Sequence, residues 1–376
     1  MLLAAAVRIP TSVQTLTVGQ TDTAARDLLA QQNVAKVWFD GRPTYGEEPL
    51  ASYPPATYAV LWVLVGGLDQ EAARWLWALL SLCALGLVSF VAVRVAGFER
   101  WPQRAMLAVL PFSIYGSAQS IWNGQLTPLV LAALGVCMLL IDSPRRYWWR
   151  DGLLAGCFLI ALTKPSLSAP FFWVVLLRRG GQRASVLIVA GYVGLTALAT
   201  SYQTGGATAV FSTWLERAQR GIVKGSSLNG YGSLSDLLGT LDLSAYSIYA
   251  SLAALGACGL LVLLTRDRDL WLVIGVVAIV SRLWTYHRVY DDGVVLFALL
   301  SLARVAQQRP SQRRQLAFAL VILLALWGAS HAPVGQLYRS ALWFHGFASA
   351  QLFVWCAALG YLLVLLCRPP RPASSE

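Results

Sequence analysis

Apolar segments recur along this chain from residue 56 almost to its C-terminus, separated by short polar stretches. They lie at 56–66, 72–97, 105–121, 125–141, 152–162, 166–177, 185–202, 246–265, 270–286, 293–306, 316–330 and 342–367. A helix needs about 20 apolar residues to cross a bilayer, so the first, fifth and sixth segments are short for a crossing. Helices are the expected spanning element, because no strand alternation is visible and lipid requires every backbone polar group to be satisfied internally.

Composition favours an all-α polytopic membrane protein. Only 12% of the residues are charged and 57% are hydrophobic, whereas soluble domains carry about 25% charged residues. This excludes an ordinary soluble enzyme, a disordered chain and a disulfide scaffold. The 15 Trp and 14 Tyr residues suit a protein that is anchored at two membrane–water interfaces. The six Cys residues lie within apolar segments and form no CxxC pair, which indicates packing rather than disulfides or a zinc site.

Arginine residues mark alternate loops between the apolar segments. The groups are Arg94, Arg100 and Arg104; Arg145, Arg146 and Arg150; Arg178, Arg179 and Arg183; Arg266 and Arg268; Arg304, Arg309, Arg313 and Arg314; and Arg368 and Arg371. Loops rich in Lys and Arg face the cytoplasm. The net charge of +11 is therefore attributed to the arginine-rich loops on the cytoplasmic side of the membrane. No nucleic-acid partner is predicted.

The arginine pattern also predicts how two short segments are arranged. Arg150 and Arg178 both fall on the cytoplasmic side, so residues 152–177 must enter the membrane and return. We expect a helical hairpin there, with Lys164 at its centre. The segment 56–66 is expected to dip into the outer leaflet as a re-entrant element without crossing.

The predicted domain is one integral-membrane unit, residues 1–376, with about eleven transmembrane helices. Two extracytoplasmic regions, 11–71 and 203–245, lie opposite the arginine-rich loops, and residues 368–376 form a cytoplasmic tail. Residues 2–7 are too short to span a membrane, so nothing visible translocates the external N-terminus. We therefore expect a first helix to be missing upstream or reduced to residues 2–7.

Lys164 is the most informative single polar residue. An ionisable side chain inside an apolar run costs about 3 kcal/mol unless it is paired or hydrated, so such residues tend to be functional. Its ammonium group can hold a phosphate as a point charge. The alternative is a lysine that extends to the membrane interface from a kinked hairpin.

A second polar cluster lies at the outer end of a predicted helix, in residues 284–292. It contains His287, Arg288, Tyr290, Asp291 and Asp292. The guanidinium can neutralise an anionic leaving group, and a carboxylate can orient a sugar or a base. Alternatively, the cluster is a local set of ion pairs that ends the helix. The other two histidines, His331 and His345, are expected to be structural, and the spacing of the three predicts no metal site.

The N-terminal region offers carboxylates for general base catalysis, which needs one carboxylate within reach of an acceptor hydroxyl. The candidates are Asp22, Asp27, Asp40, Glu47 and Glu48. Spacing alone does not choose among them.

Two further motifs present polar groups on the same predicted side. Tyr53 precedes two prolines that stiffen the start of the re-entrant segment. Asn123 and Gln125 flank a glycine in a tight turn, where their amides can bind sugar hydroxyls. A turn that only joins two helices is the alternative.

Together these motifs resemble glycosyltransferase family 87, the polyprenol-phosphate-mannose-dependent mannosyltransferases of the GT-C membrane superfamily. The resemblance rests on Thr21-Asp22-Thr23, on Ser52-Tyr53-Pro54-Pro55, on Asn123-Gly124-Gln125, and on Ala155-Gly156 followed by Leu162-Thr163-Lys164-Pro165. The stretch from Arg282 to Asp292 resembles a late outer-loop motif of the family more loosely.

The resemblance implies a GT-C-like bundle and a reaction outside the cytoplasm, in the plasma membrane. A hexose, expected to be mannose, would pass with inversion from a polyprenyl-phosphate donor to a glycolipid or polysaccharide acceptor. By position Asp22 matches the family's catalytic acidic residue, with Asp27 as the alternative, and no cofactor is implied. From the residues themselves, Lys164 and Arg288 are assigned to the donor phosphate. The predicted substrate contacts are Tyr53, Asn123, Gln125, His287, Tyr290, Asp291 and Asp292.

Two other classes of protein fit the same sequence features. A transporter or flippase for a lipid-linked sugar would share the hydrophobicity and the intramembrane lysine, but inverted repeats and broken helices near the midplane would be expected. A non-catalytic membrane assembly subunit could keep the fold and would tolerate substitution of Asp22.

Overall fold

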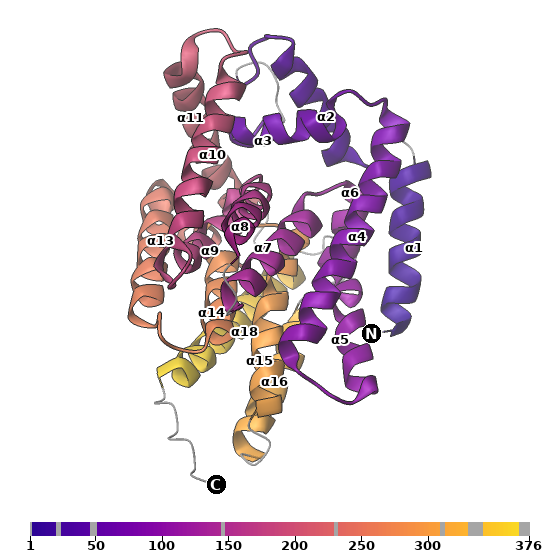
Figure 1. Ribbon diagram of the computed structural model, residues 1–376, viewed down its shortest axis with the longest axis vertical. Coiled ribbons are helices and arrows are strands. Elements are labelled where there is room, and N and C mark those ends of the chain that lie inside the picture. Colours follow the sequence, from indigo (N-terminus) through magenta and orange to yellow (C-terminus); the bar gives the residue numbers. More distant parts are fainter. Residues whose placement is uncertain are drawn as a thin grey trace.

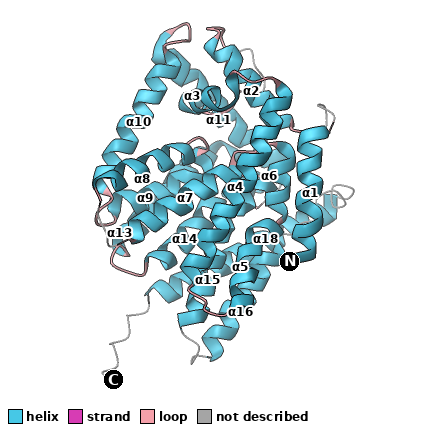
Figure 2. Cartoon of the chain, turned by 45° about the vertical axis from the view of Figure 1, so that its right-hand side comes forward, coloured by secondary structure: helices cyan, strands magenta, loops and turns pink. Residues whose placement is uncertain are grey.

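The chain is helical throughout the part that the structure describes. The computed structural model describes residues 2–19, 24–45, 51–143, 147–228, 232–308, 313–329 and 341–367. Within these ranges it contains helices and loops and no strand (Figures 1 and 2). The predicted all-helical class is therefore confirmed.

Four helices in the described ranges are long and apolar enough to cross a membrane by themselves. They are α4 (Gln70–Ala96), α10 (Gln182–Thr200), the stretch Ser244–Leu264 that contains α13 (Ser247–Leu264), and the part Ser349–Cys367 of α18 (Ala341–Cys367). The 27 residues of α4 measure about 40 Å, which exceeds the roughly 30 Å hydrocarbon layer. Large apolar side chains on α4, α10 and α13 are exposed, as lipid contact requires. The number of crossings, predicted as about eleven, stays a prediction.

Shorter apolar helices form the interior of the bundle. These are α7 (Thr127–Asp142), α9 (Pro165–Leu177) and α14 (Leu270–Leu283). A helix that is apolar on all sides is typically buried by other helices. Nearly all of α14 is buried, between α9, α15 (Leu296–Gln308) and α18. The helix α16 (Arg313–Ala329) packs against α15 and α18.

The N-terminal helix is longer than the sequence indicated. A first helix is expected to be missing upstream or reduced to residues 2–7, whereas α1 spans Leu2–Val18 and packs against α4, α5 and α6. Polar threonine residues in the second half of α1 made the helix difficult to predict from the sequence. The hydroxyls of Thr11 and Thr15 donate to the carbonyls of Val7 and Thr11, at 2.8 Å each, so these side chains satisfy themselves within the helix.

The apolar segment 105–121 is two helices rather than one. The first, α5, spans Trp101–Ser113, and α6 spans Tyr115–Asn123. They are separated at Ile114, which has extended geometry with ψ 133°. Pro111 removes one backbone donor near this break. The break turns α6 toward the short 3₁₀ segment η3 (Val289–Val295), against which α6 packs.

The two regions predicted as extracytoplasmic loops are also largely helical. Region 11–71 contains α2 (Arg26–Phe39), α3 (Pro55–Leu61) and the π-helical turn η1 (Trp62–Gly66). Region 203–245 contains α11 (Gly206–Leu228) and α12 (Leu234–Thr240). In Figure 1, α2 and α3 lie across one end of the molecule, above α6 and α7. Their placement outside the membrane stays a prediction. It also stays a prediction that segment 56–66 dips into the outer leaflet without crossing the membrane.

The region 152–177, predicted as a helical hairpin, is a helix–turn–helix unit, and its entry into the membrane and return stay a prediction. It consists of α8 (Trp148–Ala161) and α9, joined by a turn at residues 162–164. Pro165 is the first residue of α9. A backbone N–H at this position makes no hydrogen bond within the helix, so proline is tolerated there. Proline also disfavours helical geometry in the residue before it, and Lys164 accordingly has φ −129° and ψ 78°. The hairpin turn therefore positions Lys164 outside both helices.

Candidate functional site

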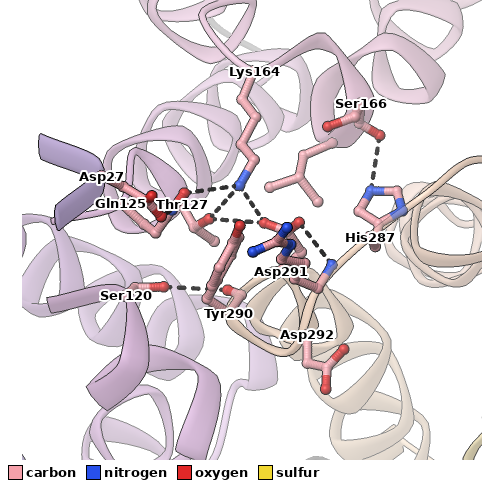
Figure 3. A network of polar contacts seen from close by, with 12 residues as sticks. Asp27, Ser120, Gln125, Thr127, Lys164, Ser166, His287, Tyr290, Asp291 and Asp292 are labelled. Carbon is pink, nitrogen blue, oxygen red and sulfur yellow. Dashed lines mark hydrogen bonds and ion pairs between the residues drawn. The ribbon is translucent and has the colours of Figure 1, made fainter. Parts of the chain in front are cut away.

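The Lys164 ammonium is buried and fully paired. Its residue is 5% exposed. Nζ donates to Gln125 Oε1 at 3.3 Å and to Thr127 Oγ1 at 3.2 Å, and it forms an ion pair with Asp291 (Figure 3). The centroid of the Tyr290 ring lies 4.6 Å away. Because an ammonium group has three hydrogens, every hydrogen of Lys164 has a protein acceptor. The charge of Lys164 is therefore satisfied by protein groups, and the side chain does not extend to a membrane interface.

Asp291 is held at the same point by the segment that follows α14. Its Oδ1 accepts from Thr127 Oγ1 at 3.1 Å, and its Oδ2 accepts from the backbone N–H of Arg288 at 3.3 Å. Burial alone would raise the pKa of this carboxyl. The Lys164 charge, the hydrogen bond from Lys164 and the hydrogen bond from the Arg288 N–H outweigh burial, so the pKa of Asp291 lies below its ordinary value. Asp291 is thus a carboxylate at neutral pH.

Asp27 lies on the other side of the same network, in the first turn of α2. Its Oδ2 accepts hydrogen bonds from the side-chain amides of Asn123 and Gln125. Gln125 thus bridges Asp27 and Lys164, since its oxygen accepts from Lys164 and its nitrogen donates to Asp27. The described residues donate no hydrogen bond to the second oxygen of Asp27. Burial raises the pKa of Asp27 above the ordinary aspartate value, although Lys164 and Arg288 counteract it.

Asp27 opens into a small pocket between α2, α4 and the turn that joins α6 to α7. The volume of the pocket is about 10 Å³, which is room for about one water molecule. Its lining consists of Asp27, Leu28, Gln31, Tyr53, Leu61, Trp77, Gly124, Gln125 and Leu126. Tyr53 is fixed by its backbone, because its N–H donates to the Tyr58 hydroxyl at 3.2 Å and its carbonyl accepts from the Tyr45 hydroxyl at 2.6 Å. The pocket therefore brings a carboxylate, side-chain amides and aromatic rings together.

Gly124 allows α2 to approach this turn closely. It caps α6 in the left-handed conformation, with φ 71°, and a Cβ atom there would lie 2.4 Å from the Leu28 Cβ. The backbone N–H of Ala25 donates to the Trp122 carbonyl at 3.1 Å and ties the start of α2 to the same turn. The contact between Asp27 and its two amides depends on this close approach.

Replacing Gly124 with alanine should therefore destabilise the protein and separate Asp27 from Asn123 and Gln125. The left-handed conformation alone costs a non-glycine residue about 1–2 kcal/mol, and the clash with Leu28 adds to it. Gly97→Ala is the matched control, because Gly97 has φ 68° with no atom within 4 Å of the added carbon. We expect a larger loss of thermal stability in detergent for Gly124→Ala than for Gly97→Ala. Equal losses would contradict the close approach of α2.

Arg288 is the exposed cation of the site. Its Nε donates to the Tyr286 hydroxyl, and no carboxylate of the described residues forms an ion pair with its guanidinium. Its charge acts on Asp27, whose pKa it lowers. Unlike the saturated Lys164, Arg288 keeps donors that an anionic ligand can use.

His287 and Asp292 belong to the surroundings of the network. The fully buried His287 ring contacts the carbonyls of Thr285 and Ser166 at 2.8 and 3.2 Å. Burial lowers its pKa to about 4, so the imidazole is neutral and ties the loop after α14 to the start of α9. Asp292 points away from Lys164 (Figure 3) and pairs with the buried Arg282 at 2.5 Å. Direct contact of either residue with a substrate remains a prediction.

Several predicted site residues thus meet, and others do not. Asp27, Asn123, Gln125, Lys164 and Asp291 form one hydrogen-bonded chain. Tyr53, Tyr290 and Arg288 lie beside it. Asp22, Glu47, Glu48 and His331 lie outside the residues that the structure describes, as does the predicted tail at 368–376.

Thr127 is a member of the network that the sequence analysis did not identify. The only local signal was its position two residues after Gln125, where it is the first residue of α7. Within the described ranges, no three His, Cys, Asp or Glu side chains are grouped closely enough to hold a metal ion.

Comparison with known proteins gives one informative similarity. No family model matches the chain, and no solved structure matches it. The chain is 28% identical over 198 residues to a polyprenol-phosphate-mannose-dependent alpha-(1-2)-phosphatidylinositol mannoside mannosyltransferase of Mycobacterium tuberculosis (strain ATCC 25618 / H37Rv). The match covers 46% of this chain and 44% of that protein, so it spans less than half of either. The similarity supports, in a general way, a relation to mannosyltransferases.

Proposed function

We propose that this protein is a membrane glycosyltransferase that transfers a hexose from a polyprenyl-phosphate donor to a glycolipid or glycan acceptor. The observation that carries the proposal is the buried chain from Asp27 through Gln125 to Lys164 and Asp291, with Arg288 beside it. The partial similarity to a mannosyltransferase favours mannose as the sugar. An extracytoplasmic active face and a plasma-membrane location are parts of the same proposal.

Asp27 is the proposed general base. Its free carboxylate oxygen would take the proton of an acceptor hydroxyl as the hydroxyl oxygen forms a bond to the anomeric carbon. The bond from that carbon to the phosphate oxygen breaks in the same displacement, so the configuration inverts and no enzyme nucleophile is needed. The raised pKa of Asp27 makes it a stronger base than an exposed aspartate, which favours proton transfer near neutral pH.

The leaving phosphate gains negative charge in this step, so cations near it would stabilise the transition state. Arg288 is the proposed direct contact, because its guanidinium is exposed and lacks a carboxylate partner among the described residues. Lys164 is saturated by protein acceptors. It would act on the phosphate through its charge, while it orients Gln125 and Asp291.

Replacing Arg288 with glutamine should weaken use of the donor. A hydrogen bond to a charged group contributes about 1.5–3 kcal/mol, so we expect kcat/KM for the lipid-phosphate donor to fall about 10- to 100-fold. Arg288→Lys should recover part of the loss, since it keeps the charge without the fork of donors. The control is Arg42→Gln, at an arginine 61% exposed that pairs with Asp40. Equal donor kinetics in both glutamine variants would refute the assignment.

Purified protein in lipid tests the proposed function itself. The donors would be labelled polyprenyl-phosphate mannose, glucose and arabinose, and the acceptors a membrane glycolipid extract. Transfer of label to a lipid product is the expected result, with mannose as the preferred donor. Transport of an intact lipid-linked sugar between leaflets without any transfer would favour a flippase instead. Absence of both activities would favour an assembly subunit.

A further inference from the structure

Pro170 leaves one backbone carbonyl of α9 without its usual helical partner. It is buried in the interior of α9, five residues after Pro165. In an α-helix the carbonyl of Ser166 would accept a hydrogen bond from the N–H of residue 170. Proline has no N–H, and its ring also clashes with the carbonyl four residues earlier. The Ser166 carbonyl, in the first turn of α9, is therefore available to donors outside the helix.

The loop after α14 contacts this carbonyl twice. The indole Nε1 of Trp284 donates to it at 2.7 Å, and the His287 ring contacts it through Nε2 at 3.2 Å (Figure 3). A neutral imidazole has one N–H, and the Nδ1 atom of His287 also contacts a carbonyl, that of Thr285, at 2.8 Å. The Trp284 indole can only donate, so it is the contact that holds in either tautomer of His287.

The same short segment of α9 holds the loop at both of its ends. Beside Trp284, the hydroxyl of Ser281 donates to the Leu167 carbonyl at 2.6 Å, which ties the last turn of α14 to the first turn of α9. At the other end of the loop, Asp291 pairs with Lys164. Residues 164–167 therefore determine where the loop 284–291 lies.

Arg288 lies between these two attachments. Its backbone N–H donates to Asp291 Oδ2 at 3.3 Å, and its carbonyl accepts from the Asp291 N–H at 2.8 Å, whereas the residue as a whole is exposed. A ligand that binds a mobile loop must order it, and a loop that is already held in place reduces this cost. The Arg288 guanidinium is thus presented from a backbone that is fixed on both sides.

We propose that Trp284 is a positioning residue for the donor phosphate, and that Pro170 makes this role possible by freeing the Ser166 carbonyl. The inference rests on the proposed function, because it concerns how Arg288 is held where the lipid phosphate is proposed to bind. Trp284 acts through the backbone of the loop and does not touch the substrate. Its loss should therefore weaken use of the donor and leave use of the acceptor unchanged.

Trp284→Phe removes the indole N–H and keeps an aromatic ring. We expect KM for the polyprenyl-phosphate donor to rise about 3- to 10-fold, the effect of losing one ordinary hydrogen bond, with little change in kcat or in the acceptor KM. Trp173→Phe is the matched control. The Trp173 indole is also half-buried, but it donates to the Leu255 carbonyl at 2.9 Å and so joins α9 to α13. An equal rise in donor KM for both variants would overturn the proposal, since it would indicate a general effect of losing an indole.

Pro170→Ala tests the same anchor from the side of the carbonyl. It restores an N–H that can donate to Ser166 within the helix, and the two lone pairs of that oxygen already face Trp284 and His287. The new donor should displace a loop contact, so the donor KM should again rise about 3- to 10-fold. The melting temperature should not fall, because α9 gains a backbone hydrogen bond.

Pro10→Ala is the control for this variant, because Pro10 lies inside α1 at an exposed position. It should leave the donor KM unchanged. An unchanged donor KM in Pro170→Ala, or a rise that occurs only with a lower melting temperature, would overturn the role of the freed carbonyl.

Two measurements that need no turnover separate this inference from the proposed function. Amide hydrogen exchange in peptides covering 284–291 should be about 3- to 10-fold faster in Trp284→Phe than in the wild type, and unchanged in Trp173→Phe. Polyprenyl phosphate, with polyprenol as its phosphate-free control, should raise the melting temperature of the wild type more than that of Trp284→Phe. Both results without sugar transfer would reject the enzyme and keep the positioning role. Equal exchange, or equal shifts with polyprenyl phosphate, would overturn that role whether or not transfer occurs.

Discussion

Replacing Asp27 with asparagine is expected to abolish most transferase turnover in a protein that still folds. General base catalysis contributes about 10²- to 10⁴-fold to rate, so kcat should fall by that factor. Asparagine keeps a side-chain oxygen that can accept from Asn123 or Gln125, the two amides that contact Asp27. Steady-state kinetics with labelled donor would measure the loss, and the substrate KM values should change much less than kcat.

Two aspartate controls sharpen this prediction. Asp40 caps the C-terminal end of the same helix α2 and is 58% exposed, so Asp40→Asn should leave turnover unchanged. Asp22→Asn tests the position that matches the family motif. Full activity in Asp27→Asn together with loss in Asp22→Asn would move the base to Asp22 and refute the role given to Asp27.

The pH profile provides an independent check of the same residue. The proposed base works only when ionised, so activity should rise with pH through the pKa of Asp27. Burial raises that pKa above the ordinary aspartate value, and the acid limb should therefore lie at higher pH than an exposed aspartate would give. Residual activity in Asp27→Asn should lack this limb. The same limb in the variant would assign it to another group.

Lys164→Met should cause the largest loss of stability among the substitutions considered. The change removes the charge and leaves Asp291, which is 4% exposed, buried without its counterion. Breaking a buried ion pair from one side costs about 3–5 kcal/mol. Thermal unfolding in detergent should report this loss. Lys36→Met is the control, because the Lys36 ammonium donates to the Leu68 carbonyl at 2.9 Å and forms no ion pair among the described residues.

The double variant Lys164→Met/Asp291→Asn separates stability from function. Replacing both charges removes the uncompensated carboxylate, so most of the stability should return. Transfer activity should not return, because the positive charge near the leaving phosphate is still missing. A double variant as unstable as Lys164→Met would show that the pair does not explain the loss. A stable and active double variant would remove Lys164 from the proposed mechanism.

Much of the fold follows from local sequence patterns. The apolar segments predict helices where the structure has them, and the interruption at Lys164-Pro165 predicts the turn between α8 and α9. These features depend on local hydropathy and on the backbone conformations that proline excludes. Both can be read from residues that are neighbours in the sequence. The helix α1 and the break at Ile114 were not predicted. In α1, threonines that bond within the helix looked like loop residues, and in segment 105–121 continuous hydropathy concealed the change in backbone direction.

The amino-acid sequence by itself determined that this is an all-helical chain with a lysine isolated between two short apolar helices. It also determined which polar residues were available for a site. Only the tertiary structure decided which of them meet: Lys164 pairs with Asp291, 127 positions away, and Asp27 meets Gln125 across 98 positions. Such partners are chosen by how the helices pack, and a buried charge must find its counterion wherever packing brings one. The pocket lined by Trp77 arises in the same way, since nothing in the local sequence of α4 distinguishes that indole from its lipid-facing neighbours.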